Sequence, residues 1–378
     1  MKILHIIDSG GLYGAEIMLL NLAREQMAQG HQVVIASIGT PGERRKPIET
    51  AAADMAIPVR VFRMRPGPNL AGGRRILRYA RKYGAEILHS HGYKGDILFG
   101  LMPRRIRGIP LVTTLHGWTS TDSFSLLRLY EMADRIALGN VDGVVMVSRS
   151  MALPRGLKKR LGRRLQVIDN GIEEKIPLAD KEIRRDLLDF CSRKPTIGAI
   201  GRLSPEKGFD QLIRAFRILL RQGLDIQLII LGEGEERDRL EELTATTPEG
   251  KERILLPGFI GSASQYMPYF DLLAMPSLTE GLPITLLEAM RARTAVVASA
   301  VGGIPDIVRN DVSALLVPPQ DPEALAASLG RLLGDKVLTG RLTEHAHQDF
   351  LKRYTSRRMA NRYTELYRQA CSAGNKKR

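Results

Sequence analysis

The chain has 378 residues, 44% of them hydrophobic, which is longer than a single hydrophobic core usually supports and predicts two domains. The two cysteines, Cys191 and Cys371, are too few for a disulfide framework, so they exclude a disulfide-stabilised scaffold and indicate a reducing, cytoplasmic compartment. No apolar run reaches the roughly 18 residues of a membrane-spanning helix, because Asp8 and the glycines after it interrupt the first one, and we expect a soluble or peripheral protein.

The net charge of +15 is concentrated in the first half of the chain. Residues 1–170 contain 26 Lys and Arg against 13 Asp and Glu, whereas the remaining residues contain 30 against 28. The excess lies in three runs, at 63–82, 104–107 and 155–164. Such runs suit an anionic partner, and they also suit ordinary solvated surfaces. Nucleic acid is a remote alternative as that partner, because aromatic residues are scarce among these runs.

The first half of the chain alternates short apolar segments with helical patterns. A strand is expected at 2–7, a glycine-rich turn at 9–14, and then a helix in which leucines recur at helical spacing before Gly30. Further strands are expected at 33–36, 86–89, 111–115, 144–147 and 166–168. Short apolar strands separated by helices predict a parallel sheet that is covered on both faces.

The pattern restarts after a charged connection at 173–194. Strands are expected at 196–200, 227–231, 254–256, 272–275, 295–298 and 314–317, with a helix at 211–221 after the first of them. This arrangement predicts a second doubly wound domain. We therefore divide the chain into an N-terminal domain at 1–172, the connection, a C-terminal domain at 195–350, and a final helical segment at 351–378 that returns to the N-terminal domain.

Two such α/β domains facing one another would leave a central cleft lined by the carboxyl ends of both sets of strands, where open sheets bind ligands. Polar motifs follow several of these strands. The segment IGRLSPEKGFD places Arg202 and Lys207 on one loop after the strand at 196–200. A planar guanidinium and a lysine ammonium together can neutralise a diphosphate leaving group without a metal ion.

A second motif, PSLTEGLPITLLEAM, follows the strand at 272–275. It places Glu280 in a Glu-Gly-Leu-Pro turn and Glu288 in the next helix, with Pro283 near the first turn of that helix. Gly281 allows close approach of a ligand to the backbone, and the helix N-terminus offers free N–H groups to an anion. Carboxylates at these positions suit the hydroxyl groups of a sugar.

The chain resembles the retaining family-four, group 1 glycosyltransferases, in which a Gly-Arg-Leu…Glu-Lys-Gly loop and a Glu-x7-Glu element occupy these relative positions. The resemblance covers nearly the whole chain. Supporting segments are GGLYGAE at 10–16, LHSHGYKGD at 88–96, TLHGW at 114–118, VVMVSRS at 144–150, VIDNGI at 167–172, LGEGEER at 231–237, LPGFI at 256–260 and VGGIPDIV at 301–308. It implies a GT-B fold of two Rossmann-like doubly wound domains.

The resemblance also implies a role for each matched residue of the second domain. Arg202 and Lys207 would bind the diphosphate of a nucleotide-sugar donor, UDP- or GDP-linked, and Glu288 would bind its ribose. Glu280, supported by Gly281 and Leu282, would bind hydroxyl groups of the transferred sugar. Two further residues, Gly258 and Phe259, would border the base, mainly through their backbone.

In the first domain the resemblance implies that Gly11 and Gly14 approach the donor, although Leu12 and Tyr13 within this glycine-rich loop depart from the simplest family pattern. His116 would lie beside the reactive face of the sugar and fix its orientation. A single histidine after a strand is more often a structural hydrogen-bond partner, and the surrounding motif favours the functional role here. His89 and His91 are not expected to bind a metal.

The implied activity is transfer of a sugar to a hydroxyl acceptor with retention of anomeric configuration, in bacterial-type polysaccharide or glycoconjugate synthesis. No cofactor or metal is expected, and the sequence contains no Asp-x-Asp pair. A nucleotide-sugar 2-epimerase and a sugar phosphorylase are alternatives with the same architecture. The basic first half favours an anionic membrane surface and a lipid-linked acceptor, which would place the protein peripherally on the inner face of the cytoplasmic membrane.

Overall fold

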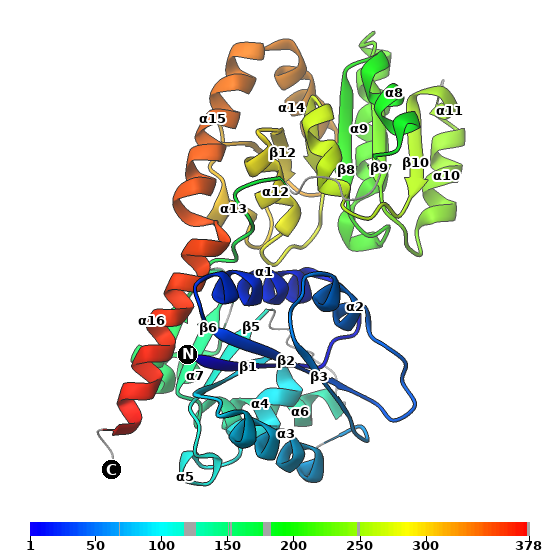
Figure 1. Ribbon diagram of the computed structural model, residues 1–378. Coiled ribbons are helices and arrows are strands. Elements are labelled where there is room, and N and C mark those ends of the chain that lie inside the picture. Colours follow the sequence, from blue (N-terminus) through cyan, green and yellow to red (C-terminus); the bar gives the residue numbers. More distant parts are fainter. Residues whose placement is uncertain are drawn as a thin grey trace. The chain divides into compact units, whose positions relative to one another are not determined.

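The computed structural model describes residues 1–67, 69–116, 126–149, 151, 153–176, 183–247 and 250–375, without the side chains of 126–131, 250, 251 and 373–375. The chain divides into two compact units. The first consists of Met1–Gly171 and Ser356–Arg378, and the second of Ile172–Thr355. Each unit is built on its own parallel sheet (Figure 1). No helix of the described residues is long and apolar enough to cross a membrane.

The described residues of the first unit form a seven-stranded sheet in the order β3-β2-β1-β4-β5-β6-β7. Every neighbouring pair is parallel. Its strands are β1 (Lys2–Ile7), β2 (Gln32–Gly39), β3 (Val59–Arg63), β4 (Ile87–His91), β5 (Leu111–Leu115), β6 (Gly143–Met146) and β7 (Leu165–Val167). The central strands are buried on both faces because helices cover the sheet from two sides.

Two separate hydrophobic clusters show which helices cover each face. On one face lie α1 (Gly14–Ala28), α2 (Pro47–Asp54) and α16 (Ser356–Asn375), so the two ends of the chain sequence pack together in this unit (Figure 1). On the other face lie α3 (Leu70–Tyr83), α4 (Tyr93–Gly100) and α6 (Leu126–Leu138). Shorter helices are α5 (Arg104–Arg107), α7 (Arg155–Leu161) and the 3-10 helix η1 (Gly162–Arg164).

The described residues of the second unit form a six-stranded parallel sheet in the order β10-β9-β8-β11-β12-β13. The strands are β8 (Thr196–Ile200), β9 (Gln227–Leu231), β10 (Ile254–Gly258), β11 (Leu272–Met275), β12 (Ala295–Ser299) and β13 (Leu315–Val317). The main core of this unit lies between the sheet and α9 (Phe209–Arg221), α10 (Arg237–Ala245) and α14 (Pro322–Gly334).

Other helices of the second unit pack on the remaining surface of its sheet. The helix α12 (Ile284–Ala292) contacts β12, α15 (Lys336–Arg353) and the 3-10 helix η3 (Ala263–Tyr269). The remaining helices are α8 (Arg185–Arg193), η2 (Pro205–Lys207), α11 (Gly250–Arg253) and α13 (Ile304–Ile307).

The prediction of two doubly wound, Rossmann-like parallel-sheet domains is confirmed. One strand, β3, was absent from the sequence expectations. It lies at the edge of the first sheet, where only Phe62 is buried, so its sequence VRVFR lacks the apolar run of a central strand.

Some predicted boundaries need correction. The segment predicted as a connection at 173–194 belongs to the second unit and contains α8, because Leu187 and Cys191 of that helix are buried there. The returning segment starts at Ser356, not at 351, since α15 continues to Arg353 in the second unit. Pro283 immediately precedes α12 and forms its N-cap.

Candidate active site

The strand order of the second unit brings two predicted loops together. β8 and β11 are neighbours in the sheet although two other strands lie between them in the chain. Arg202 and Lys207 follow β8, and Glu280 follows β11. In doubly wound sheets ligands bind beyond the carboxyl ends of the strands, where the strand order reverses. The predicted diphosphate and sugar residues therefore lie at the point where this fold places ligands.

The two loops meet in an ion pair. Lys207 Nζ lies 2.5 Å from Glu280 Oε1, and the hydroxyl of Ser277 donates a hydrogen bond of 2.8 Å to the same oxygen. The Glu280 side chain is only 9% exposed, whereas that of Lys207 is 26% exposed. Arg202 is 58% exposed and pairs with Glu206 at 2.5 Å. The site thus combines a fixed carboxylate with two cations that solvent can reach.

Backbone contacts fix the spacing of these loops. Gly208 has φ of +63°, and a Cβ on it would lie 2.3 Å from the carbonyl oxygen of Pro276. The N–H of Leu278 donates to the carbonyl of Glu206 at 2.8 Å. Only glycine permits this close approach, so the conformation of the Arg202–Lys207 loop is coupled to the loop that carries Glu280.

A third loop that the sequence analysis did not assign to the site contacts Glu280. The N–H of Gly303 donates to the carbonyl oxygens of Glu280 and Gly281, at 3.2 and 3.0 Å. Gly302 has φ of +53°, and a Cβ on it would lie 1.7 Å from the Glu280 carbonyl. The paired glycines of the VGGIPDIV segment were the available signal, because adjacent glycines after a strand often mark a close backbone approach.

Glu288 lies on α12, and the exposed Gly281, the buried Leu282 and Pro283 separate Glu280 from the start of that helix. Burial raises the pKa of Glu288, with Arg291 and Ser264 acting in the opposite direction. Arg291 also donates to the carbonyls of Glu173 and Lys175, which ties α12 to the start of this unit. The carboxyl group is therefore held in a partly buried position, not on a freely solvated helix face.

The residues predicted to border a base lie at the end of β10. Gly258 is buried, with φ of +89°, and its carbonyl accepts from the N–H of Gly232 at 3.0 Å. Phe259 is 77% exposed, so its ring, as well as its backbone, is available to a ligand. Both residues belong to the loop at the carboxyl edge of the same sheet as Arg202 and Glu280.

In the first unit, Gly11 and Gly14 follow β1 at the N-terminus of α1. The Tyr13 ring covers Gly11, and a Cβ on Gly11 would lie 2.5 Å from that ring, whereas nothing lies within 4 Å of a Cβ on Gly14. Tyr13, which departs from the simplest family pattern, thus partly covers Gly11, one of the two glycines predicted to approach the donor. Glu16 caps the turn by accepting from the Tyr13 N–H at 3.0 Å.

Two lysines that the sequence analysis did not select lie beside this turn. Asp8 follows β1 and pairs with Lys46 Nζ at 3.0 Å and with Lys94 Nζ at 2.8 Å. Lys46 is buried and also donates to the carbonyl of Ser9 at 2.8 Å. Because Lys46 and Lys94 are far from Asp8 in sequence, only the fold brings these three charges together.

His116 follows β5 in the first unit, and its side chain is partly exposed. Its Nε2 atom lies 3.2 Å from Nδ1 of His91. Desolvation lowers the pKa of His116 to about 4, so the imidazole is neutral at neutral pH. One ring nitrogen from each of His5, His89 and His91 lies within 4.8 Å of the other two. Both nitrogens of each ring already have a hydrogen-bond partner, and a metal ion would have to replace some of those bonds.

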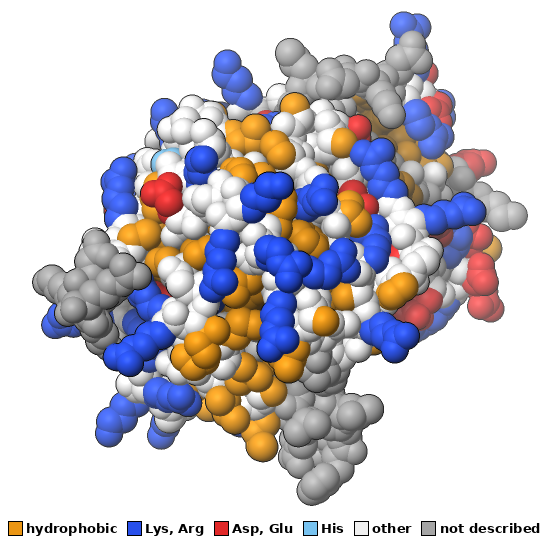
Figure 2. Space-filling model, turned by 60° about the horizontal axis from the view of Figure 1, so that its bottom comes forward, with side chains coloured by type: hydrophobic (Ala, Val, Ile, Leu, Met, Phe, Trp, Pro, Cys, Tyr) orange, Lys and Arg blue, Asp and Glu red, His pale blue; other side chains and the backbone are white. Residues whose placement is uncertain are grey.

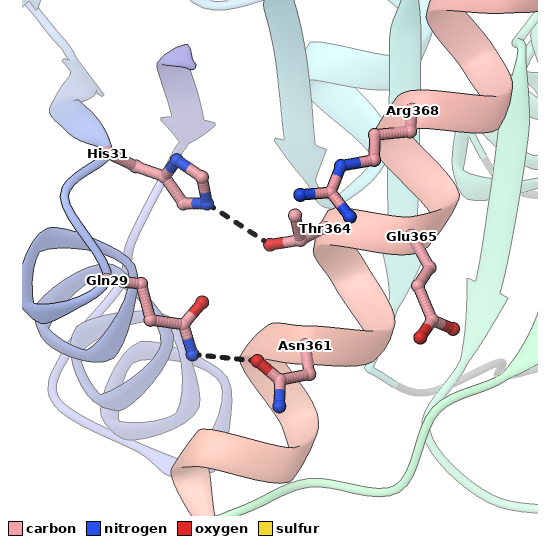
Figure 3. Close-up of a pocket in the computed structure, with 6 residues that line it drawn as sticks. All are labelled: Gln29, His31, Asn361, Thr364, Glu365 and Arg368. Carbon is pink, nitrogen blue, oxygen red and sulfur yellow. Dashed lines mark hydrogen bonds between the residues drawn. The ribbon is translucent and has the colours of Figure 1, made fainter.

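A polar pocket of about 360 Å³ in the first unit lies elsewhere (Figure 3). It is lined by Gln29, His31, Asn361, Thr364, Glu365 and Arg368. His31 precedes β2, so the pocket is at the amino ends of the strands, opposite the edge where ligands bind. Hydrogen bonds across it, from Gln29 Nε2 to Asn361 at 3.0 Å and between His31 and Thr364 at 3.3 Å, fasten α16 to the unit.

Comparison with known families accounts for both units. The family "Glycosyltransferase Family 4" matches residues 13–175, and "Glycosyl transferases group 1" matches residues 180–349. The chain belongs to the family-four, group 1 glycosyltransferases. It is a glycosyltransferase that uses a nucleotide-sugar donor.

Individual relatives cover most of the chain. The 2-deoxystreptamine N-acetyl-D-glucosaminyltransferase of Streptomyces fradiae is 27% identical over 368 residues, which are 90% of this chain and 87% of that protein. The UDP-Gal:alpha-D-GlcNAc-diphosphoundecaprenol alpha-1,3-galactosyltransferase of Escherichia coli is 26% identical over 280 residues, 70% of each chain.

The fold also matches solved structures. The crystal structure of Anabaena Alr3699/HepE in complex with UDP aligns with a TM-score of 0.80 and 23% identity, over 97% of this chain and 99% of that chain. At this level of identity the likeness concerns the fold. The glycosyltransferase therefore has the GT-B fold that its sequence predicts.

Proposed function

We propose that this glycosyltransferase binds the diphosphate of a UDP- or GDP-sugar at the Arg202–Lys207 loop and transfers the sugar to a hydroxyl acceptor with retention of configuration. The observation that carries the proposal is the Lys207–Glu280 ion pair at the reversal of strand order. A carboxylate that is 9% exposed holds the lysine in place, and the lysine side chain is still 26% exposed. The same carboxylate retains a second oxygen for the hydroxyl groups of a sugar.

The other predicted residues complete a donor site in this proposal. Arg202, on the exposed side of the loop, binds the diphosphate together with Lys207, and the N-terminus of α12 adds free N–H groups. Glu288 accepts hydrogen bonds from the ribose. Gly258 and Phe259 border the base. From the first unit, Gly14 approaches the donor and His116 orients the sugar.

The proposed reaction needs neither a metal nor a covalent enzyme intermediate. The acceptor oxygen forms a bond to the anomeric carbon, and the bond from that carbon to the phosphate oxygen breaks. The electron pair of the broken bond stays on the nucleoside diphosphate, whose oxygen takes the proton of the acceptor hydroxyl on the same face of the sugar. Arg202 and Lys207 stabilise the negative charge that develops on the leaving group.

The stereochemistry and the reaction class can be tested together. The enzyme is incubated with UDP-glucose, UDP-galactose or GDP-mannose and with a panel of hydroxyl acceptors, and the anomeric coupling constant of the product is measured by NMR. We expect release of nucleoside diphosphate that depends on the acceptor, and a product with the configuration of the donor. An inverted product would overturn retention. An epimerised donor sugar formed without any acceptor would favour the 2-epimerase.

We also propose that the acceptor is linked to a lipid and that the first unit binds an anionic membrane surface, in polysaccharide or glycoconjugate synthesis at the inner face of the cytoplasmic membrane. Figure 2 shows a face on which Lys and Arg side chains surround exposed hydrophobic ones. The exposed cations Arg74, Arg75 and Arg78 lie on α3, whose first residue, Leu70, is 62% exposed, and Ile106 of α5 is 61% exposed.

A surface that mixes basic and apolar side chains suits an anionic membrane better than a soluble partner. Each Lys or Arg near an anionic bilayer contributes about 1 kcal/mol, and apolar side chains insert at the headgroup level. The relative from Escherichia coli has a diphosphoundecaprenol-linked acceptor in its name, which supports a lipid-linked acceptor. The relative from Streptomyces fradiae has 2-deoxystreptamine, a soluble aminocyclitol, in its name. The panel of acceptors therefore includes this compound to test a soluble acceptor against a lipid-linked one.

A further inference from the structure

A network of buried polar side chains lies behind His116 in the first unit. Its members come from five elements that meet on one face of the sheet. They are His5 of β1, His89 and His91 of β4, Gln26 of α1, Thr114 of β5, and Tyr363 and Tyr367 of α16. All of them are buried, with at most 5% of any residue exposed. Because His5 and His89 are paired in register and His91 is two residues further on, the three imidazoles share that face.

One chain of hydrogen bonds connects Gln26 to His116. Nε2 of His5 lies 2.8 Å from the amide oxygen of Gln26, and Nδ1 of His5 lies 3.0 Å from Nε2 of His91. Nδ1 of His91 then lies 3.2 Å from Nε2 of His116. Each imidazole thus uses both ring nitrogens, except His116, whose Nδ1 has no partner among the described residues.

The direction of this chain is set at Gln26. Its amide NH2 group donates to the hydroxyl of Tyr367 at 3.2 Å, which leaves the amide oxygen, an acceptor only, facing His5. Nε2 of His5 must therefore carry a proton. Desolvation lowers the pKa of His5 to about 4 and that of His91 well below its usual value, so both rings are neutral and each carries a single proton.

The remaining protons follow from neutrality. Since His5 is protonated on Nε2, its Nδ1 accepts the Nε2 proton of His91. His91 then has a bare Nδ1, which accepts the Nε2 proton of His116. We infer that Gln26, acting through His5 and His91, holds His116 as the Nε2-protonated tautomer and leaves its Nδ1 as a hydrogen-bond acceptor for a hydroxyl of the donor sugar. The hydrogen bond from the donor sugar to His116 rests on the proposed function, whereas the assignment of the tautomer does not.

A second arm supports the orientation of the Gln26 amide. The Tyr367 hydroxyl accepts from Gln26 and lies 2.7 Å from Nδ1 of His89, which can accept the proton of that hydroxyl. Nε2 of His89 lies 2.8 Å from Oγ1 of Thr114, which lies 2.8 Å from the hydroxyl of Tyr363. Two tyrosines of α16 therefore anchor the network, and Gln26, His5 and His91 are positioning residues for His116.

The tautomers can be measured directly in the whole protein without any substrate. The protein is labelled with ¹⁵N-histidine, and long-range ¹H–¹⁵N spectra at pH 7.5 distinguish imidazoles protonated on Nδ1 from those protonated on Nε2. The signals are assigned with His5→Gln, His91→Gln and His116→Gln. We expect Nε2-protonated His5, His91 and His116. An Nδ1-protonated His116, or a rapid mixture of its two tautomers in the unaltered protein, would overturn the inference.

Two variants separate the directing role of Gln26 from mere packing. Gln26→Leu preserves volume but removes both hydrogen bonds, and we expect His116 to populate both tautomers and the KM for the donor to rise about 2- to 10-fold, the range of one neutral hydrogen bond. Thr114→Val removes only the bonds beyond His89 and leaves the contact between Gln26 and Tyr367, so the His116 tautomer should persist.

A His116 tautomer that is unchanged in folded Gln26→Leu would overturn the inference. If that variant does not fold, Tyr367→Phe provides the same test, because it removes the partner that fixes the Gln26 amide. An enzyme with the expected tautomers but no transfer from UDP- or GDP-sugars would refute the proposed function and leave the directing role of Gln26 intact.

Discussion

At the scale of single residues, Glu280 links the two halves of the proposed donor site. Its carboxylate accepts from both Lys207 and Ser277. Glu280→Gln keeps the shape but removes the charge-assisted bond, which should lower kcat/KM about 10- to 100-fold, equivalent to roughly 1.5–3 kcal/mol. The matched control is Glu323→Gln, on the exposed side of α14. Activity of Glu280→Gln equal to that of the control would exclude the assigned role.

A buried carboxyl pair in the first unit gives a prediction about pH. Asp96 and Asp134 are fully buried, and both oxygens of Asp134 lack a hydrogen-bond partner among the described residues. Burial raises the pKa of both groups, and for Asp134 the nearby Asp96 raises it further. In the unfolded chain these carboxyls lose their protons near pH 4. The folded unit binds more protons above that pH, so its stability falls as pH rises towards the folded pKa values.

Asp134→Asn should remove part of this dependence. We expect the variant to be more stable than the unaltered protein at pH 8, by about 1–3 kcal/mol in the free energy of unfolding, with a smaller difference at pH 5. Urea unfolding at both pH values measures this, with Asp54→Asn on the exposed side of α2 as the control. A variant that loses stability at pH 8 would mean that the Asp134 carboxylate is paired and charged.

The sequence predicted the charged residues of the second unit better than their glycine neighbours. Arg202, Lys207 and Glu280 directly follow apolar strands and belong to recognisable motifs, so their common edge could be inferred. The contact of Gly302 with Glu280 depends on how two loops cross, and no local pattern encodes that crossing. The same holds for Gln26 and Tyr367, which lie 341 residues apart in the chain.

At the scale of elements, α16 completes the core of the first unit. Tyr363 of this helix is fully buried and joins a cluster that includes residues of α1 and β1. Tyr363→Ala should destabilise the first unit by about 3–5 kcal/mol, whereas Tyr363→Phe, which removes only the hydroxyl bonded to Thr114, should cost about 1 kcal/mol.

Hydrogen exchange of the amides of β4 and β5 measures this effect within the first unit. Glu365→Ala, on the exposed side of the same helix, is the control and should leave exchange unchanged. If Tyr363→Ala were no more destabilising than Glu365→Ala, α16 would not be an integral part of this unit.

Element boundaries followed from the sequence where strands are central and buried. The expected strands at 2–7, 111–115, 196–200, 227–231 and 272–275 coincide with β1, β5, β8, β9 and β11. These strands are covered on both faces, so their sequences are largely apolar, although β1 contains His5 and β5 contains Thr113 and Thr114. The edge strand β3 was not predicted because a half-exposed strand does not need a run of apolar residues. The position of α8 was not predicted because it depends on tertiary contacts of Leu187.

At the scale of the whole molecule, the charge asymmetry predicts salt-dependent membrane binding. Sedimentation with anionic phospholipid vesicles should show binding at 0.1 M salt that is lost at 1 M, as the Debye length falls from about 10 Å to about 3 Å. Replacement of Arg74, Arg75 and Arg78 by Ser should weaken binding, and so should replacement of Lys158, Lys159 and Arg160, which are exposed on α7.

The control for these variants replaces Arg193, Arg214 and Arg221 of the second unit by Ser, which removes the same charge from an exposed surface. This variant should bind as the unaltered protein does. Equal binding to anionic and neutral vesicles would remove the membrane proposal and favour a soluble acceptor.

The assignment of the donor site is tested most directly by a calorimetric titration of the whole protein with UDP and with GDP. We expect one of the two nucleotides to bind with a single site, and Lys207→Ala to weaken its affinity about 10- to 100-fold, the loss of one charge-assisted contact to the diphosphate. Arg214→Ala, on the exposed face of α9, should bind as the unaltered protein does. Binding of neither nucleotide, or equal affinity in Lys207→Ala, would contradict the assignment of the donor site.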